Sequence, residues 1–343
     1  MNIAAINDAP LPATTQAPVG ASAQSTIAYN TAAAATSISA DAQPTSAPSN
    51  SKVKRGDCSS QPAGSGPQVK PDTPEAFENY PYFHALANSQ SPPFPYIEKF
   101  RDLNGSTQQN SYLTYYVLKS YDVNQCANLC NNVDLCTAFN IYVERDPSLD
   151  PGPACPNPPS TTNYKCALWG SSISKQTATN TGQYRQDFHG KNFSHHDHHL
   201  VVIAASNGYD KTFFTHPSAV SSFTLGQNIS GQAITLAGSK TLGSEFFAGP
   251  YDPNLCGYYA TAQTSANKQN AQSKALSSYQ ACNSFNAYTV YKAGYAWGTY
   301  CELYNFNVDA SYAGSADSTS NGISYTVGSS WIYSLTKQDS GKL

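Results

Sequence analysis

The sequence predicts an α+β fold: two related modules, each a short helix on a small antiparallel sheet with disulfides, preceded by a disordered propeptide-like segment. Three observations predict it. An internal repeat runs from about residue 110 onward, all nine cysteines lie at position 58 or later, and residues 1–55 are rich in Ala, Ser, Thr and Pro. A repeat of this length indicates duplicated modules, and the change in composition indicates where the folded part begins.

The composition excludes several classes of protein. Charged residues make up 12% of the 343 residues, about half of the ~25% usual in globular proteins. The net charge of -3 produces little long-range field, which disfavours capture of nucleic acid or of an anionic membrane. No stretch approaches the ~18 apolar residues that span a bilayer, and residues 331–343 carry no hydrophobic tail for a lipid anchor. We expect a monomer with no nucleic-acid partner, no membrane span and no cofactor.

The cysteines indicate an oxidising compartment. Nine cysteines occur in a low-charge chain with 24 tyrosines and one methionine, which favours a secreted, extracellular or cell-wall protein. The alternative is nine buried free thiols in a cytosolic protein. Residues 1–20 lack the basic and apolar regions of a secretion signal, so we expect that a signal has been removed or that the chain starts late.

Residues 1–55 read as a disordered propeptide, because they cannot bury enough apolar surface to offset chain entropy. The segment ends in the basic pair Lys54 and Arg55, just before the first cysteine, Cys58. Kexin-type processing proteases cleave after such pairs, although a basic pair also arises by chance. Residues 56–100 form a Pro-rich segment with one short helix, for which Thr73 is a good N-cap and Pro74 fits the first helical position.

The repeat defines two modules, residues 101–209 and 210–343. Three motifs occur in the same order in both. They are Tyr121-Asp122-x-Asn124-x-Cys126 and Tyr251-Asp252-x-Asn254-x-Cys256; Cys136-x-x-Phe139-Asn140-x-Tyr142 and Cys282-x-x-Phe285-Asn286-x-Tyr288; Cys166-x-Leu168-Trp169 and Cys301-x-Leu303-Tyr304.

Each motif has a structural interpretation. Asp122 and Asp252 can cap a helix, and residues 139–143 alternate apolar and polar as in a half-buried strand. Further strands are expected before each helix, at 113–118 and 245–248, and after the third motif, at 200–203 and 323–333. Each module is therefore a helix on a small antiparallel sheet.

The pattern Cys-x3-Cys-x5-Cys-x-x-Phe, followed by Cys-x-Leu-Trp, resembles the PAN/apple module. Residues from about 56 to 336 are similar to a family of fungal secreted proteins with two such modules. The likeness is carried by residues 72–77 (DTPEAF), 139–147 (FNIYVERDP), 155–162 (CPNPPSTT), 180–184 (NTGQY) and 206–209 (SNGY). PAN/apple modules bind proteins or carbohydrates, so the resemblance implies a binding function; the fungal family has no agreed activity.

The resemblance also implies a disulfide pairing. It pairs Cys126 with Cys166, Cys130 with Cys136 and Cys256 with Cys301, and it leaves Cys58 and Cys155 as a further pair. Ala260 stands where the second module would have the counterpart of Cys130, so Cys282 is expected to be a free, buried thiol. Other connectivities remain open on the sequence alone.

One polar cluster could hold a metal. Histidine is a common ligand of zinc, copper and nickel, and residues 187–199 also hold Asp187 and Asp197. The alternative is a solvated loop, inserted relative to the related proteins, that binds metal only adventitiously. The five histidines are His189, His195, His196, His198 and His199.

Catalytic motifs are absent from the sequence. Glu144, Asp146 and Asp150 could in principle hydrolyse a glycoside, but their Pro-rich context reads as an exposed turn. No nucleophile elbow, zinc-protease helix or phosphate loop occurs, and Cys282 has no identifiable base. We expect no enzyme and name no catalytic residue.

Aromatic side chains could instead form a binding face for protein or sugar, or could simply cover the sheets. The candidates are Tyr112, Tyr115, Tyr116, Tyr142, Trp169, Tyr288, Trp297 and Tyr304.

Three sequons, at Asn104, Asn192 and Asn228, fit surface loops of a secreted glycoprotein. The expected function is a secreted or cell-wall-associated, non-enzymatic binding or structural protein that recognises protein or carbohydrate. The alternatives are an effector or toxin-like protein released by processing at Arg55 and, more remotely, a secreted hydrolase.

Overall fold

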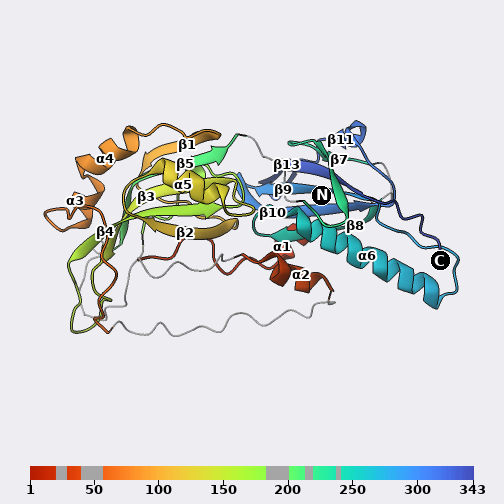
Figure 1. The fold of residues 1–343 in the computed structure, drawn as a ribbon, viewed down its shortest axis with the longest axis horizontal. Helices are drawn as coiled ribbons and strands as arrows, with labels where there is room; N and C mark the ends of the chain where they lie inside the picture. Colours follow the sequence, from red (N-terminus) through yellow and green to blue (C-terminus); the bar gives the residue numbers. More distant parts are fainter. Residues whose placement is uncertain (21–28, 40–56, 183–200, 213–218, 237–240) are drawn as a thin grey trace. The chain divides into compact units, whose positions relative to one another are not determined.

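The computed structural model describes residues 1–20, 29–39, 57–182, 201–212, 219–236 and 241–343. These residues form two compact units (Figure 1). The first unit contains the described residues between 14 and 20 and between 57 and 212; the second contains residues 1–13 and 29–39 and those from 219 onward. Each unit combines helices with antiparallel strands, which confirms the α+β class.

In the first unit the sheet has five strands in the order β1-β5-β3-β4-β2, and all four strand pairs are antiparallel. Its elements are α3 (Pro74–Glu78), α4 (Pro81–Asn88), β1 (Tyr96–Leu103), β2 (Tyr112–Leu118), α5 (Val123–Asn131), β3 (Ala138–Pro147), β4 (Ser160–Trp169), the 3-10 helix η1 (Lys175–Thr177) and β5 (Val202–Lys211).

In the second unit the main sheet has the order β12-β13-β9-β10-β8, and β6 also pairs with β13. Its elements are α1 (Ile3–Asp8), α2 (Thr31–Ser39), β6 (Phe223–Asn228), β7 (Ala233–Ile234), β8 (Thr241–Ala248), α6 (Pro253–Ser273), β9 (Ser284–Lys292), β10 (Tyr295–Tyr304), the 3-10 helix η2 (Ala310–Tyr312), β11 (Ala313–Gly314), β12 (Ser318–Ser320) and β13 (Ile323–Leu335). A small separate ladder pairs β11 with β7.

The two sheets share one topology. The path β6-β13-β9-β10-β8 repeats the path β1-β5-β3-β4-β2, and a helix lies between the second and third strands of each set in the chain. The sequence motifs therefore mark a duplicated fold that also includes β1 and β6, two strands that the motifs do not cover.

The helices begin where the sequence predicts. The side chain of Thr73 accepts from the amide of Ala76, and that of Asp122 accepts from the amide of Gln125. Asp252 caps α6 in the same way. The expectation of a short helix is wrong for the second unit, however, since α6 has 21 residues. Helix α4 and strand β1 are also additions to the single helix expected in residues 56–100. No helix in the described ranges combines the length and apolarity that crossing a bilayer requires.

The conserved spacing of the repeat has a direct structural cause. The hydroxyl of Tyr121 donates to the carbonyl of Ala205 over 2.6 Å and also contacts the carbonyl of Ile141 at 3.4 Å. The hydroxyl of Tyr251 donates over 3.1 Å to the carbonyl of Ala287, the equivalent of Ile141. These contacts attach the start of each helix to the third strand of its sheet.

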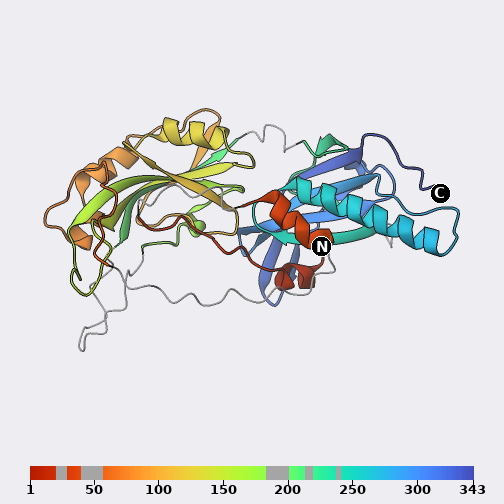
Figure 2. The ribbon, with the colours of Figure 1, turned by 60° about the horizontal axis from the view of Figure 1, so that its bottom comes forward.

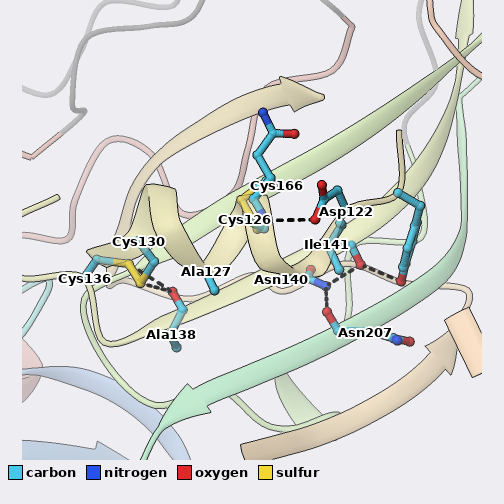
Figure 3. Close-up of a disulfide and its surroundings, with 12 residues drawn as sticks. Asp122, Cys126, Ala127, Cys130, Cys136, Ala138, Asn140, Ile141, Cys166 and Asn207 are labelled. Atoms are coloured by element: carbon cyan, nitrogen blue, oxygen red, sulfur yellow. Dashed lines mark hydrogen bonds between the residues drawn. A yellow bond between two sulfur atoms is a disulfide. The ribbon is translucent and has the colours of Figure 1, made fainter. Parts of the chain in front are cut away.

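The asparagine of the second motif is buried in both units and joins the central strand to its neighbour. Asn140 donates to Ser206 Oγ. It also donates to the carbonyl of Asn207 (Figure 3). Asn286 donates to Ser330 Oγ and to the carbonyl of Trp331. The repeated motifs are therefore parts of the scaffold.

Disulfide bonding is confirmed, and the structure joins the four pairs that the resemblance implies. All nine cysteines lie in the described ranges, and Cys282 is the one without a disulfide. The bridges Cys126–Cys166 and Cys256–Cys301 join each helix to the fourth strand of its sheet, at Cα separations of 5.6 and 5.2 Å (Figure 3 shows the first). The other two are Cys130–Cys136 and Cys58–Cys155.

The expectation that residues 1–55 are disordered does not hold for the part that the structure describes. Residues 3–8 form α1, residues 31–39 form α2, and residues 14–20 pack on the first unit. Ile6 is fully buried and Ala17 nearly so. These residues are ordered because of contacts with the sheets. Their few apolar side chains are too sparse to form a core of their own, but each is buried against an aromatic sheet.

Strand β3 also differs from its expectation. Residues 139–143 alternate as in a half-buried strand, but all ten residues of β3 are buried. The helix covers one face of this sheet and other segments of the chain cover the opposite face, so both faces are removed from water.

Candidate binding surface

Each sheet has two faces that differ in what covers them. On the helix face, the disulfide-bonded cysteines Cys166 and Cys301 point toward α5 and α6. Side chains alternate between the faces along a strand, so Lys165 and Tyr300, which precede those cysteines, lie on the opposite face. We call this opposite face the covered face, because segments from residues 1–20 pack on it in both units.

The covered face of the first unit is aromatic. Ala17 packs into a buried cluster that includes Tyr112, Tyr115, Tyr142 and Trp169. Tyr112 and Trp169 meet edge to face at 5.4 Å between ring centroids. A single alanine from residues 1–20 therefore closes an aromatic surface contributed by three strands.

A buried ion pair lies beside this cluster. Lys165 Nζ is 2.5 Å from Glu144 Oε1, and the side chains of both residues are at most 1% exposed. The ammonium also lies 5.1 Å from the ring centroid of Tyr115, an arrangement in which the ring face attracts the cation.

Residues 15–20, which we call the N-terminal segment of the first unit, form hydrogen bonds with both members of this ion pair. Lys165 Nζ donates to the carbonyl of Pro18 over 2.6 Å, and the amide of Gly20 donates to Glu144 Oε1 over 3.0 Å. The amide of Gln109 donates to the carbonyl of Thr15 over 2.9 Å. Three backbone groups of residues 15–20 are thus bound by the first unit, two of them by the Lys165–Glu144 pair and one by the segment that precedes β2.

Two further polar side chains adjoin the pair. Asn163, which faces Glu144 across the ladder between β3 and β4, donates to Asp146 Oδ2 over 2.6 Å. Burial raises the pKa of Glu144, the neighbouring Asp146 carboxyl adds to this rise, and Lys165 opposes it. Glu144 therefore holds a proton more tightly than an exposed glutamate does.

The covered face of the second unit is built in a related way. Ile6 of α1 packs into a buried cluster with Tyr288, Val290 and Tyr300, and α1 lies beside the strands in Figure 2. The hydroxyl of Tyr300 accepts from the amide of Asn2 over 2.8 Å.

Asn7 adds a side-chain contact at the same face. Its Oδ1 accepts from Lys292 Nζ over 2.8 Å and from the hydroxyl of Tyr325 over 3.0 Å. Lys292 also lies 4.6 Å from the ring centroid of Trp297. This face therefore binds α1 by an apolar contact and by polar contacts to Asn2 and Asn7.

Lys165 and Tyr300 occupy equivalent positions. Each precedes the cysteine of the third motif, and each lies opposite the tyrosine of the second motif, Tyr142 or Tyr288. Both side chains bind a backbone group of residues 1–20, although one is a cation and the other a phenol. The position before the third-motif cysteine is therefore a backbone-binding position in both units.

A third contact holds residues 29–39 in the second unit. Asp252 Oδ2 accepts from the hydroxyls of Tyr29 and Thr31 over 2.9 and 2.6 Å, while Asp252 Oδ1 caps α6. Burial and then the Asp252 carboxylate raise the pKa of the Tyr29 hydroxyl, so Tyr29 remains a hydrogen-bond donor.

The aromatic candidates do not form an exposed face. Six of the eight are buried, and Tyr116 and Trp297 are half-buried. They lie inside the units because the second face of each sheet is covered, whereas a one-sided sheet was expected. The buried six are Tyr112, Tyr115, Tyr142, Trp169, Tyr288 and Tyr304.

The sequence analysis did not identify Lys165 as a binding residue. It also placed Glu144, the ion-pair partner of Lys165, in an exposed turn. The interpretation of Glu144 and Asp146 as part of an exposed turn is wrong: both lie in β3 and are at most 2% exposed. A usable signal was present, because Lys165 interrupts the otherwise apolar run 164–169 at a position that points away from the helix.

The remaining sequence candidates are partly outside the described residues. The five histidines of residues 189–199, the sequon Asn192 and the basic pair Lys54 and Arg55 all lie there. Within the described ranges, no group of three or more His, Cys, Asp or Glu side chains could hold a metal ion. The sequons at Asn104 and Asn228 are described, and both asparagines are exposed.

Cys282 lies where the sequence places a buried thiol. It belongs to the core that also contains Cys256 and Ala260 of α6, and its amide donates to Thr264 Oγ1 of that helix over 2.9 Å. Burial raises the pKa of the Cys282 thiol to about 12. Such a thiol is a poor nucleophile at neutral pH.

No known protein family, curated protein or solved structure matches this chain in the comparisons made.

Proposed function

We propose that this chain is a secreted or cell-wall-associated, non-enzymatic protein that binds other polypeptides through two PAN/apple-like modules. One observation carries the proposal: the covered face of each unit already binds a separate segment of polypeptide by its backbone. A surface that recognises backbone groups and one or two small apolar side chains is suited to an extended peptide or a short helix.

The chemistry of the two faces favours polypeptide over carbohydrate as the ligand. The bound groups are the backbone carbonyl of Pro18 and the backbone amides of Gly20 and Asn2, which are groups that a polypeptide repeats along its length. Ala17 and Ile6 supply the apolar contacts. Aromatic clusters around such small anchors give large contact area at low entropy cost.

The cellular location rests on covalent structure. Four disulfides and two exposed sequons are typical of an oxidising, extracellular compartment. The low charge of the chain limits long-range attraction, so recognition would depend on the short-range contacts of the covered faces.

The test is a comparison of covered and uncovered protein on arrays of secreted proteins, peptides and glycans. Ala17→Asp and Ile6→Asp each place a charge inside an apolar cluster and should expel the segment that covers the face. Thr14→Asp and Ala4→Asp are matched controls, because both positions are exposed. We expect peptide or protein ligands to bind the Ala17→Asp or Ile6→Asp variant more tightly than the controls. Binding to glycans alone, or equal binding by all variants, would refute a polypeptide-binding face.

A second candidate, a hydrolase, is favoured by one specific observation. Glu144 and Asp146 lie on the same face of β3, and the pKa of Glu144 is raised by burial and by Asp146. A buried carboxyl that holds its proton beside a second carboxyl suits general acid catalysis. Turnover of a chromogenic glycoside or peptide by Ala17→Asp, lost in the combined variant with Glu144→Gln, would replace the binding proposal with this one.

A further inference from the structure

We infer that Lys165 and Glu144 form a subsite for an extended peptide of the type small-Pro-x-Gly, and that residues 17–20 are its built-in occupant. The inference rests on the proposed binding function and names the ligand chemistry of the first unit's covered face. Lys165 binds the carbonyl of the proline and Glu144 binds the amide of the glycine.

The scaffold itself does not require the ion pair. In the second unit the positions equivalent to Glu144 and Lys165 are Val290 and Tyr300, and the same sheet topology forms there without a charge pair. Removing two charges from water is costly, and apolar replacements are often at least as stable. A buried pair that the fold can omit is best explained by what it binds.

The pair is also incomplete without the peptide. Lys165 Nζ has the Glu144 carboxylate and the Pro18 carbonyl as hydrogen-bond acceptors, and its side chain is 0% exposed. Removing residues 17–20 would take away one of these acceptors and the amide donated to Glu144. A buried charge that lacks part of its hydrogen bonding is strongly unfavourable, so the empty subsite favours a new occupant that restores both bonds.

The occupant's sequence matches the shape of the subsite at three positions. Ala17 is 3% exposed within the aromatic cluster, and such a tightly packed position favours a small side chain. Pro18 holds the chain extended and needs no partner for an amide hydrogen. Gly20 is buried at a φ of +87°, a conformation that residues with a Cβ rarely adopt.

A third backbone hydrogen bond lies N-terminal to these contacts. The carbonyl of Thr15 accepts from the amide of Gln109, just before β2, so the first unit binds backbone groups at three places along six residues. The side chains of Thr14 and Pro18 are exposed. A ligand peptide can therefore vary at its outward positions and must keep the small residue, the proline carbonyl and the glycine.

The experiment is binding of a fluorescent peptide of residues 12–22 to the full chain, measured by anisotropy. In the wild-type chain the attached segment competes at high effective concentration, so the protein used carries Ala17→Asp, which frees the face. We expect saturable binding to this variant and at least tenfold weaker binding to the wild type. Absence of binding to Ala17→Asp would overturn the inference.

Variants on the protein side test the ion pair. Adding Lys165→Met to Ala17→Asp should weaken peptide binding at least tenfold, Lys165→Arg should retain part of it, and Lys175→Met, at an exposed position, should leave it unchanged. Binding that is unchanged by Lys165→Met would overturn the subsite and leave the polypeptide-binding face intact. A different result would separate the two proposals. If the peptide binds in a Lys165-dependent way but no ligand is found on the arrays, the subsite is supported and the proposal of an external polypeptide ligand is refuted.

Variants on the peptide side keep the test valid if Lys165→Met fails to fold. A peptide with Gly20→Ala or Ala17→Asp should bind at least tenfold more weakly to the same Ala17→Asp protein, and a peptide with Thr14→Ser should bind equally. Equal binding of all four peptides would overturn the inference.

Discussion

The buried ion pair of Lys165 and Glu144 makes a quantitative prediction for unfolding. Lys165→Met removes the cation and leaves the carboxyl buried. Breaking a buried pair by removing one partner typically costs about 3–5 kcal/mol. The pKa of Glu144 is already raised by burial and by Asp146, so the carboxyl can take up a proton when Lys165 is lost. We therefore expect about 3 kcal/mol near neutral pH and a smaller loss at pH 5.

The double variant should be more stable than the single one. Glu144→Leu together with Lys165→Met removes both charges, which is often neutral or stabilising by ~1–4 kcal/mol. Against this, the amide of Gly20 and the carbonyl of Pro18 lose their partners, at about 1–3 kcal/mol for each buried group left unpaired. The net expectation is a loss of roughly 1–2 kcal/mol, below that of Lys165→Met alone.

Guanidinium unfolding of the full chain, with the single and double variants arranged as a cycle, measures this coupling. Lys175→Met is the control for loss of an exposed positive charge. If Lys165→Met costs under about 1 kcal/mol, or if the two single costs simply add, the pair is not a coupled buried interaction and the argument for the subsite loses its basis.

The remaining predictions concern pH, disulfides, the free thiol and processing. The raised pKa means that Glu144 binds a proton more tightly in the folded state than in the unfolded state. The stability of the wild type relative to Glu144→Gln should therefore fall as the pH rises above ~4.3. A difference between the two urea midpoints that does not change with pH would contradict this. Replacing both Cys126 and Cys166 by alanine opens a loop with a sequence separation of 40 and should cost roughly 3–4 kcal/mol, visible as a lower melting temperature; an unchanged melting temperature counts against it. Cys282 should not react with a thiol reagent until denaturant is added, and rapid labelling of the native protein would show that the packing is wrong. Processing after Arg55 should give a secreted chain that begins at the next residue. Because residues 1–20 pack on both units, the chains are separated under denaturing conditions before N-terminal sequencing, and a full-length chain that still begins at residue 1 would exclude cleavage.

The features that could be predicted from the sequence are those with local causes. A side-chain cap acts within one turn, so Thr73, Asp122 and Asp252 mark their helices correctly. The alternation in residues 139–143 and the repeated cysteine spacing likewise gave the central strands and the α+β class.

The features that could not be predicted depend on contacts between distant residues. Ile6 and Ala17 are isolated apolar residues in a polar segment, and nothing near them in the chain indicates that an aromatic sheet will bury them. The burial of Glu144 follows from the same packing, because its carboxylate meets Lys165 across the sheet and Gly20 from another part of the chain. The Pro-rich context after β3 concealed that the strand continues to Pro147.

The comparison of the two units separates scaffold from recognition. Where the units agree, in Tyr121 and Tyr251 or Asn140 and Asn286, the side chains bond to the unit's own strands. At the position of Lys165 they differ, since the second unit has Tyr300 there. Both of these side chains bond to a residue of their own unit and also to a backbone group of residues 1–20. A lysine requires an acceptor, whereas a phenol can accept an amide hydrogen. The two covered faces should therefore select different peptides, the first an extended segment with a free carbonyl and the second a helix N-terminus with a free amide.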